Sequence, residues 1–453
     1  MKIKKFIILV LSVIMICPFS RAVDIYADED SFDLPEFPEI SSDYVVLMDA
    51  DSGEVLYSSN ADSKCYPAST TKLLTGLLTV ENCALTDVIT FSETAVNSIE
   101  YGDANASISA GEQLTVEQAL YCLILRSANE VAYGLAEYIG QTAASFASMM
   151  NSRAEELGAV NTHFTNPSGL SDEFHYTTAY DMALIAKACF DNKTLMNIIS
   201  YSDLYTIPPT NKSNFTRYYR HRYQMLSGGD FAYEYSMGGK TGYTDDAGSC
   251  LVSFAQKDDL RLICVIMKST DTGRYEDTIS LFDYYFNNYQ KIYLDDYDTG
   301  LSTGNIDILN LVNKIDSTTD ISVGFAENSY LLVPDSVTMS ELTGIVTYAD
   351  NPAYTGKEGG FACISYYYEN INVGNATIMI NDSAQNNGTG FNGVPAVSYE
   401  TFRRDPGNII YINIFYVLGG IFASLLIAFI IVLAVRKRRR RTGRRGSGKL
   451  RFK

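Results

Sequence analysis

The stretch that decides the fold is Ser249–Phe254 (SCLVSF), which a short polar turn joins to Leu260–Met267 (LRLICVIM). Short apolar segments on either side of a polar turn predict two paired strands. A second hairpin is indicated far upstream, where Tyr44–Met48 and Val55–Tyr57 flank a turn that contains Gly53. The two hairpins predict one sheet that is completed by distant segments of the chain.

Helices are predicted between the two hairpins and after the second one. Apolar residues recur there at spacings of three and four, which is typical of helices that pack on a core. The segments with this pattern are Thr70–Val80, Val116–Leu125, Glu130–Tyr138, Phe146–Leu157, Ala179–Phe190 and Arg274–Tyr289. The order of elements therefore predicts an α/β (α+β) layered domain over residues 41–293, an antiparallel sheet flanked by helices with a helical subdomain.

The segments around this domain differ from it in composition. Residues 23–40 are rich in Asp, Glu and Pro and are expected to be a flexible lead-in. In residues 296–381, short alternating segments are separated by Gly, Asn, Asp and Pro, which predicts a small all-β domain. Residues 382–408 are polar and are expected to be a linker.

Two apolar segments indicate export and membrane attachment. Residues 1–22 combine basic residues, an apolar run and a small-residue cleavage site, which predicts a signal peptide; an uncleaved membrane helix is the alternative. Residues 409–435 contain no charged residue and predict a C-terminal transmembrane helix, with a buried core helix as the alternative. The basic residues of 436–453 predict a cytoplasmic tail, which places the preceding domains outside the cell membrane.

Charge is distributed unevenly along the chain, whose formal value is −18 from 35 basic and 53 acidic residues. Fifteen of the basic residues and no acidic ones lie in 1–22 and 436–453, so residues 23–435 carry 20 basic against 53 acidic residues, about −33. Nucleic-acid binding by the exported part is therefore not expected, because phosphates need Lys and Arg partners. The basic tail could bind nucleic acid in principle, but beside a membrane span it is expected to fix topology and contact anionic lipid.

Metal, cofactor and disulfide chemistry are not indicated. Once Cys17 leaves with the signal peptide, an odd number of cysteines remains, and no C-x-x-C motif or Cys/His cluster is present. The histidines, His163, His175 and His221, lie too far apart in the sequence to reveal a site. Most cysteines have apolar neighbours, as Cys264 does, and are expected to be buried small residues.

Three short motifs occur in one order: Ser69–Lys72 (STTK), Ser127–Asn129 (SAN) and Lys240–Gly242 (KTG). Each motif alone is a weak signal. Ser69 lies at the predicted start of a helix, and Lys72 falls on the same face, about 5–6 Å away between β-carbons. A serine nucleophile needs a base, and a desolvated lysine near another cation supplies one, while the helix N-terminus favours a developing oxyanion. The alternative is that Ser69 only caps the helix.

The other two motifs have polar side chains suited to a substrate. In Ser127–Asn129, between two predicted helices, a hydroxyl is able to relay a proton and an amide to hold both Lys72 and a substrate carbonyl; a helix cap is the alternative. In Gly238–Thr244, glycines allow an extended peptide to approach a strand edge. Lys240 and the neighbouring threonine would face an anionic C-terminus, and a plain turn into a strand is the alternative.

These motifs and their flanking strings resemble the penicillin-binding serine DD-peptidases, specifically the low-molecular-mass D-alanyl-D-alanine carboxypeptidases of the β-lactamase-like superfamily. The flanking strings are Tyr66–Lys72 (YPASTTK), Asn166–Leu170 (NPSGL), Thr177–Ala183 (TTAYDMA) and Gly239–Thr244 (GKTGYT). The resemblance covers about residues 40–295 and, more faintly, the β-rich domain. It implies the DD-peptidase fold and a hydrolase of peptidoglycan stem peptides that needs no metal or cofactor.

The resemblance also implies the role of each catalytic residue. Ser69 would attack the carbonyl of the penultimate D-Ala, and Lys72 would accept its proton. Ser127 and Asn129 would assist proton transfer and position the substrate. The acyl-enzyme would release the terminal D-Ala before water regenerates the serine, and β-lactams would acylate Ser69 stably.

Substrate-binding roles follow from the third motif and one residue beyond the second hairpin. The resemblance implies that Lys240, Thr241 and Arg274 recognise the terminal carboxylate, with Gly242 in the same binding strand. The backbone N–H groups of Ser69 and Tyr243 would form the oxyanion hole, although many relatives have histidine in place of this tyrosine. Arg274 rests on its position just past the second hairpin alone, and a surface arginine is the alternative.

The expected function is therefore a penicillin-binding D-Ala-D-Ala carboxypeptidase in peptidoglycan synthesis and cell shape. A DD-endopeptidase or transpeptidase, a β-lactamase and a non-catalytic wall-binding scaffold are the alternatives. A β-lactamase is disfavoured because Ser-Ala-Asn stands where class A enzymes commonly have Ser-Asp-Asn, and no deacylating Glu motif lies between 129 and 240. The predicted transmembrane anchor also departs from the family, since many relatives end in an amphipathic helix.

Overall fold

A computed structural model describes residues 35–294 and 321–382, apart from 327, 350–355, 357–358, 361 and 369–370. Within these residues, the largest sheet has five antiparallel strands in the order β2-β1-β9-β8-β7. The strands are β1 (Tyr44–Asp49), β2 (Val55–Ser59), β7 (Ser236–Thr244), β8 (Gly248–Lys257) and β9 (Leu260–Ser269). Since β1 pairs with β9, the prediction of one sheet built from two distant hairpins is confirmed.

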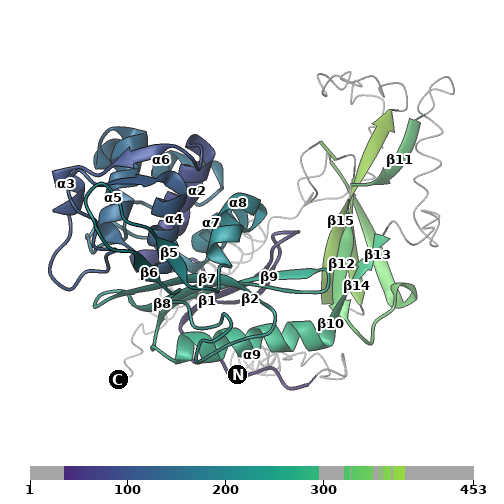
Figure 1. The fold of residues 1–453 in the computed structure, drawn as a ribbon. Coiled ribbons are helices and arrows are strands. Elements are labelled where there is room, and N and C mark those ends of the chain that lie inside the picture. The colour runs from purple at the N-terminus through teal and green to yellow at the C-terminus, as the bar shows by residue number, and fades with distance from the viewer. Residues whose placement is uncertain are drawn as a thin grey trace, which may run out of the picture. The chain divides into compact units, whose positions relative to one another are not determined.

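Both faces of this sheet are buried, which explains why its central strands are largely apolar. On β9, Ile263 and Val265 belong to a core shared with the helical region, whereas Leu262 and Cys264 face the opposite side. This alternation follows from the two-residue repeat of a strand. Helix α9 (Gly273–Asn288) lies along the second face, and the other helices gather over the first (Figure 1).

The helical region contains every helix that the apolar spacing predicts before the second hairpin. Its elements are η1, a 3₁₀ turn (Ala68–Thr71), α2 (Lys72–Asn82), α3 (Glu93–Val96), α4 (Val116–Leu125), α5 (Asn129–Gly140), α6 (Ala143–Glu156), α7 (Ala179–Asp191) and α8 (Lys193–Ile199). Helix α4 has the predicted bounds and begins at a capping box of Thr115 and Gln118. The helix predicted from Thr70 begins instead as the turn η1, so the α-helix proper starts at Lys72.

Short strand pairs join the helical region at its edges. Strand β3 (Val88–Thr90) pairs with β4 (Gln113–Thr115), and β5 (Tyr205–Ile207) pairs with β6 (Arg217–Tyr219). Three residues are too few to produce a recognisable alternation, so the sequence pattern did not predict these strands.

A second β region follows α9 and has its own apolar core. Strand β10 (Tyr289–Tyr293) pairs with β12 (Tyr330–Pro334). Among the described residues, another sheet has the order β11-β15-β14-β13. The 3₁₀ turn η3 directly precedes β13 in the chain. The bounds are β11 (Ile321–Phe325), η3 (Met339–Glu341), β13 (Leu342–Tyr348), β14 (Ala362–Tyr368) and β15 (Ile371–Asp382). The all-β character predicted here matches these elements, while the domain boundaries stay predictions.

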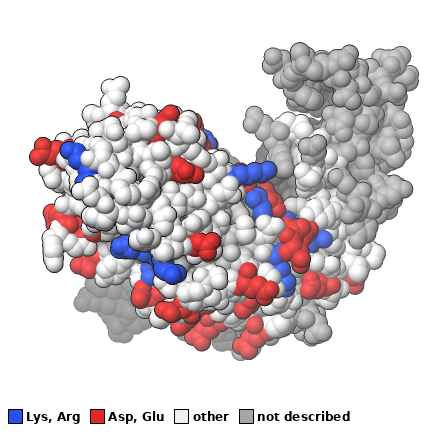
Figure 2. Space-filling view, viewed as in Figure 1, with Lys and Arg blue, Asp and Glu red and all other residues white. Residues whose placement is uncertain are grey.

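The predicted signal peptide, transmembrane helix and basic tail lie outside the described residues, as do most of the lead-in and linker. Within residues 35–294 and 321–382, no helix is both long and apolar enough to cross a membrane. Phe37, in the predicted lead-in, stacks on Tyr57 with ring centroids 5.0 Å apart. Figure 2 shows Asp and Glu side chains most densely along the lower edge of the view, with Lys and Arg in small groups.

Candidate active site

Ser69 lies in the tight turn η1, directly before the first residue of α2. The turn is closed by hydroxyl groups, since Thr70 Oγ1 donates to Pro67 O (2.7 Å) and Thr71 Oγ1 donates to Ala68 O (2.8 Å). The interpretation of Ser69 as a helix cap is wrong, because Thr71 occupies the N-cap of α2. Ser69 Oγ instead accepts a hydrogen bond from Lys72 Nζ at 3.0 Å.

Lys72 is fully buried and its ammonium group has three acceptors. Besides Ser69 Oγ, Nζ donates to Asn129 Oδ1 (2.6 Å) and to Ser168 O (2.5 Å). Burial lowers the pKa of Lys72 to about 7, against the opposing effect of the negative charge of Glu130. A lysine with this pKa and this contact is suited to take the proton of Ser69 near neutral pH.

The SAN motif connects α4 to α5 and lies against Lys72. Ser127 has a left-handed backbone with φ 60°, and Asn129 is the first residue of α5. Ala128 is the N-cap of α5, so the interpretation of the motif as an Asn cap is wrong. The N–H of Asn129 donates to Ala104 O at 2.9 Å, which fixes the backbone while the side chain accepts from Lys72.

Lys240 lies within strand β7, which forms one end of the largest sheet, and pairs with Val252 of β8. The interpretation of the motif as a plain turn is therefore wrong. Lys240 Nζ donates to Ser127 Oγ (3.0 Å) and to Thr241 O (2.7 Å). Burial, together with the positive charge of Lys72, lowers the pKa of Lys240 well below its usual value. An anion bound here would supply the negative charge that this lysine lacks.

The KTG strand packs against the turn that carries the nucleophile. A β-carbon added to Gly242 would lie 3.1 Å from the backbone N of Ser69, so glycine lets β7 lie against the turn without crowding it. Tyr243 follows, and its side chain is 63% exposed with its hydroxyl 3.1 Å from Asp245. The exposed side chain of Tyr243 therefore lies outside the polar cluster, and its backbone directly follows Gly242 in strand β7.

Arg274 is buried at the start of α9, so the interpretation of a surface arginine is wrong. Its Nη1 donates to the carbonyl oxygens of Gly242 and Cys250, both at 3.3 Å, and its Nη2 pairs with Asp271 at 2.5 Å. The structure thus places Arg274 against strands β7 and β8, where its positive charge adds to the effect on Lys240. The hydrogen bonds of its guanidinium go to these backbone and carboxylate groups.

A loop that sequence reasoning left without a role supplies the third acceptor of Lys72. Asn166 Oδ1 accepts from the N–H groups of Ser168 (3.1 Å) and Gly169 (2.8 Å) and so shapes the loop. Gly169 has φ +82°, and a β-carbon there would lie 1.8 Å from Ala68 O. The sequence identifies Asn166–Leu170 only by its resemblance to the family, because the contact with Lys72 uses a backbone carbonyl, which every residue carries.

His175 braces the nucleophile turn from behind. Its Nδ1 accepts from the N–H of Thr165 (3.1 Å), so Nε2 carries the proton and donates to Thr71 Oγ1 (2.9 Å). Burial lowers the pKa of His175 to about 4, which keeps the ring neutral. Within the described part of the chain, no group of three or more His, Cys, Asp and Glu is placed to hold a metal ion.

The family model described as D-alanyl-D-alanine carboxypeptidase, peptidase S11, matches residues 32–271. The chain is 32% identical over 251 residues to the D-alanyl-D-alanine carboxypeptidase DacF of Bacillus subtilis, covering 54% of this chain and 62% of that protein. It is 31% identical to DacC of Escherichia coli, covering 57% of this chain and 64% of the relative. The matches thus span less than two thirds of each relative.

Solved structures share the fold. Penicillin binding protein 5 from Haemophilus influenzae matches with a TM-score of 0.60 and 25% identity, covering 76% of this chain and 98% of that one. The Streptomyces K15 DD-transpeptidase matches with a TM-score of 0.52 and 27% identity, covering 56% and 100%. The family match spans more than half of the chain and contains the three motifs that the fold brings together. The chain therefore belongs to the peptidase S11 family, the D-alanyl-D-alanine carboxypeptidases.

Proposed function

We propose that this protein is a serine D-alanyl-D-alanine carboxypeptidase that removes the terminal D-Ala from peptidoglycan stem pentapeptides. The observation that carries the proposal is the contact between a fully buried Lys72 and the hydroxyl of Ser69, at 3.0 Å. The family membership and the curated relatives' names support the substrate class.

Acylation begins with the neutral amine of Lys72. It takes the proton of Ser69 Oγ while that oxygen attacks the carbonyl carbon of the penultimate D-Ala. The negative charge that develops on the carbonyl oxygen is stabilised by backbone N–H groups, for which Ser69 and Tyr243 are the candidates because β7 approaches the turn there. The tetrahedral intermediate then breaks the peptide bond and leaves an ester on Ser69.

The leaving amine takes the proton that Lys72 accepted from Ser69, with the hydroxyl of Ser127 on the route, so Lys72 becomes neutral again. Ser127 Oγ is hydrogen-bonded to Lys240 on β7, while Asn129 beside it holds Lys72. Lys240 and Thr241 bind the terminal carboxylate, which departs with the free D-Ala. Water then attacks the ester, Lys72 assists by accepting a proton, and free Ser69 is restored.

The substitution Ser69→Ala tests this proposal. Fluorescent penicillin labelling and D-Ala release from a stem pentapeptide should both be lost, because the acyl acceptor is gone. Unfolding curves should match those of the wild-type protein. Unchanged labelling and D-Ala release in a folded Ser69→Ala variant would contradict the enzyme and favour the non-catalytic scaffold.

A transpeptidase is the second candidate, because one matched structure is a DD-transpeptidase from Streptomyces K15. The two activities share the acyl-enzyme and differ in whether water or an amine attacks it. Mass spectrometry of products from purified muropeptides separates them. Loss of one alanine per stem supports the carboxypeptidase, whereas new or opened cross-links support a transpeptidase or an endopeptidase. A penicillin adduct that disappears within seconds would indicate a β-lactamase.

The enzyme is further proposed to work outside the cell membrane, held by a transmembrane helix at 409–435 with the tail 436–453 in the cytoplasm. The support is the uncharged length of this segment and the eleven basic residues that follow it. Deletion of residues 409–453 should release penicillin-labelled protein from membranes. Protease added outside intact spheroplasts should digest the catalytic region and leave a tail epitope protected.

A further inference from the structure

Glu130 directly follows the SAN motif and is buried beside it, in the first turn of α5. Its Oε1 accepts hydrogen bonds from the backbone N–H of Ala106 (2.7 Å) and of Ile108 (3.4 Å). Its Oε2 has no hydrogen-bond partner among the described residues. Burial raises the pKa of Glu130, while its hydrogen bonds to the backbone and the positive charge of Lys72 oppose this rise. The charged form of this carboxylate therefore depends on the loop and on Lys72.

The segment that Glu130 binds, residues 103–112, is here named the bridging loop. Its Ala104 O accepts from the N–H of Asn129 at 2.9 Å, and Asn129 in turn holds Lys72. The loop is therefore attached to the catalytic cluster twice, once through the Asn129 backbone and once through the Glu130 carboxylate.

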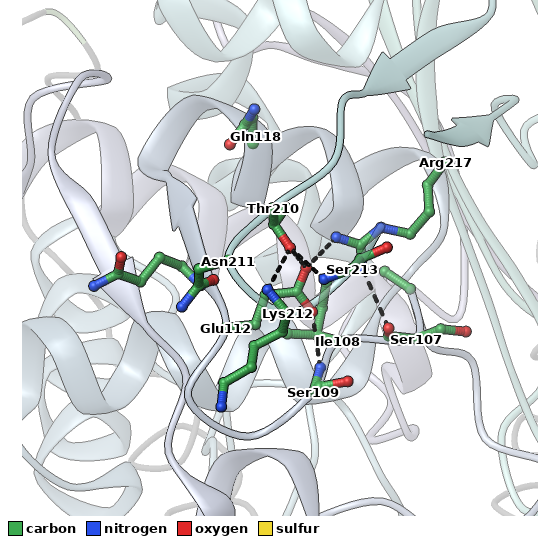
Figure 3. Close-up of polar contacts among 12 residues, drawn as sticks. Ser107, Ile108, Ser109, Glu112, Gln118, Thr210, Asn211, Lys212, Ser213 and Arg217 are labelled. Carbon is green, nitrogen blue, oxygen red and sulfur yellow. Dashed lines mark hydrogen bonds and ion pairs between the residues drawn. The ribbon is translucent and has the colours of Figure 1, made fainter. Parts of the chain in front are cut away.

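The far side of the bridging loop is anchored to the segment that carries β5 and β6. Arg217 forms a buried ion pair with Glu112, and its Nη1 donates to Ser107 O at 3.1 Å. Thr210 Oγ1 donates to the same carboxylate at 2.7 Å, and Tyr219 OH donates to Ala106 O at 2.7 Å. Figure 3 shows Arg217 and Thr210 converging on Glu112 from one side of the loop. Contacts with the β5–β6 segment thus fix the backbone of the bridging loop. Glu130 binds N–H groups of this fixed backbone.

We propose that Glu130 is a positioning residue of the reaction: one carboxylate oxygen holds the bridging loop over Asn129, and the negative charge of the group balances Lys72. This inference rests on the proposed function. Its electrostatic part agrees with the charges around Lys72, because Glu130 is the strongest charged influence on the pKa of Lys72 and opposes the lowering that burial causes.

Further charged groups act on Lys72. Asp103 on the bridging loop also raises the pKa of Lys72, while Arg222 lowers it. The positive charge of Lys72 in turn lowers the pKa values of Lys240 and His175. Glu130 itself faces Cys122 and Tyr219, whose pKa values burial raises, so both stay neutral at the pH of the assay. Glu130 is thus the buried carboxylate next to the motif that carries Lys72's amide partner.

The test measures the second-order rate of acylation by a fluorescent penicillin against pH, in the full-length protein. Glu130→Gln keeps the carbonyl acceptor for the bridging loop and removes the charge. Its plateau rate should stay near wild type, and its acid limb should move about one pH unit lower. Glu130→Asp keeps the charge and shortens the reach, so its limb should stay in place and its plateau should fall about tenfold.

The matched control is Glu137→Gln, two turns further along α5, where the carboxylate accepts a hydrogen bond from Ser92 at 2.6 Å. Its pH profile and plateau should equal those of wild type. An unmoved acid limb in folded Glu130→Gln would overturn the charge balance, and an undiminished plateau in Glu130→Asp would overturn the positioning. If the wild-type protein is not acylated at all, the proposed function fails instead.

Discussion

The helical side of the catalytic cluster and its strand side each contain a buried lysine, but the neighbours of the two lysines differ. Lys72, at the start of α2, is surrounded by oxygen acceptors and has Glu130 as its strongest charged neighbour. Lys240, on β7, contacts a hydroxyl and a carbonyl oxygen, and the charges that act on it are all positive. Lys72, whose positive charge has a negative neighbour, is able to exchange a proton. Lys240, on which positive charges act, favours the binding of an anion. Burial is common to both, so the neighbouring charges decide the role.

Substitution of Lys72 should have the largest effect on the rate of acylation. Lys72→Ala should lower the rate of penicillin acylation about 10³- to 10⁴-fold, because Lys72 is the one base that contacts Ser69 Oγ within residues 35–294 and 321–382. Stopped-flow fluorescence with a labelled penicillin measures the rate. The control Lys187→Ala removes a partly exposed lysine that pairs with Asp191 at 3.1 Å, and it should leave the rate unchanged. A reduction below tenfold in Lys72→Ala would assign the proton to another group.

Substitution of Lys240 should weaken substrate binding more than it slows the chemical steps. Lys240→Gln should raise KM for a D-Ala-D-Ala peptide on the order of 10²-fold, because the substrate carboxylate loses its charged partner. Steady-state kinetics should be measured with the acid and with the same peptide as its C-terminal amide. The wild-type enzyme should prefer the acid strongly, and the variant should not. An equal loss for both peptides would mean that Lys240 only supports Ser127.

Low pH should remove the base function of Lys72 without any substitution, because it protonates the amine. The pKa of Lys72 is about 7, and the neutral amine is the reacting form, so acylation should rise with pH through this value. At pH 6 about one tenth of Lys72 is neutral, which predicts a rate about tenfold below the plateau. A series of acylation rates from pH 5 to 9 measures this limb. A flat profile between pH 6 and 8 would contradict the assignment of Lys72 as base.

Arg274 should give the smallest change, because it lies behind the binding strand. Arg274→Met removes a positive charge near Lys240 and the donors to Gly242 O and Cys250 O. KM for the acid peptide should rise about threefold, with little change for the amide. The midpoint of thermal unfolding measures separately how much the loss of these hydrogen bonds destabilises the fold. A loss as large as that of Lys240→Gln would place Arg274 in direct contact with the carboxylate.

Much of the fold follows from local patterns. Apolar spacing located α4 at its observed bounds, and the apolar runs of β8 and β9 identified strands buried on both faces. The order of the three motifs also named the residues that the structure brings together around Lys72 and Lys240. These features could be predicted because each depends on residues that are neighbours in the sequence or on a recognisable string.

The remaining features depend on contacts that no local pattern records. Ser168 contributes a backbone carbonyl to Lys72 from 96 residues away, and any residue type carries such a group. His175 and Glu130 became visible only when folding placed them behind the nucleophile turn and beside the SAN motif. The 3₁₀ turn at Ser69 was missed for a similar reason, because the loop with Gly169 and strand β7 press against Ala68.

Ala68 and Ser127 have left-handed backbones, with φ 47° and 60°, and both flank the reacting groups. A side chain in this conformation costs about 1 kcal/mol relative to glycine. Glycine would relieve this strain at both positions. Ala68→Gly would keep the catalytic side chains intact, whereas Ser127→Gly would remove the hydroxyl that accepts a hydrogen bond from Lys240. Relief of backbone strain is thus compatible with catalysis at Ala68 and conflicts with it at Ser127. This difference matters for anyone who engineers this scaffold.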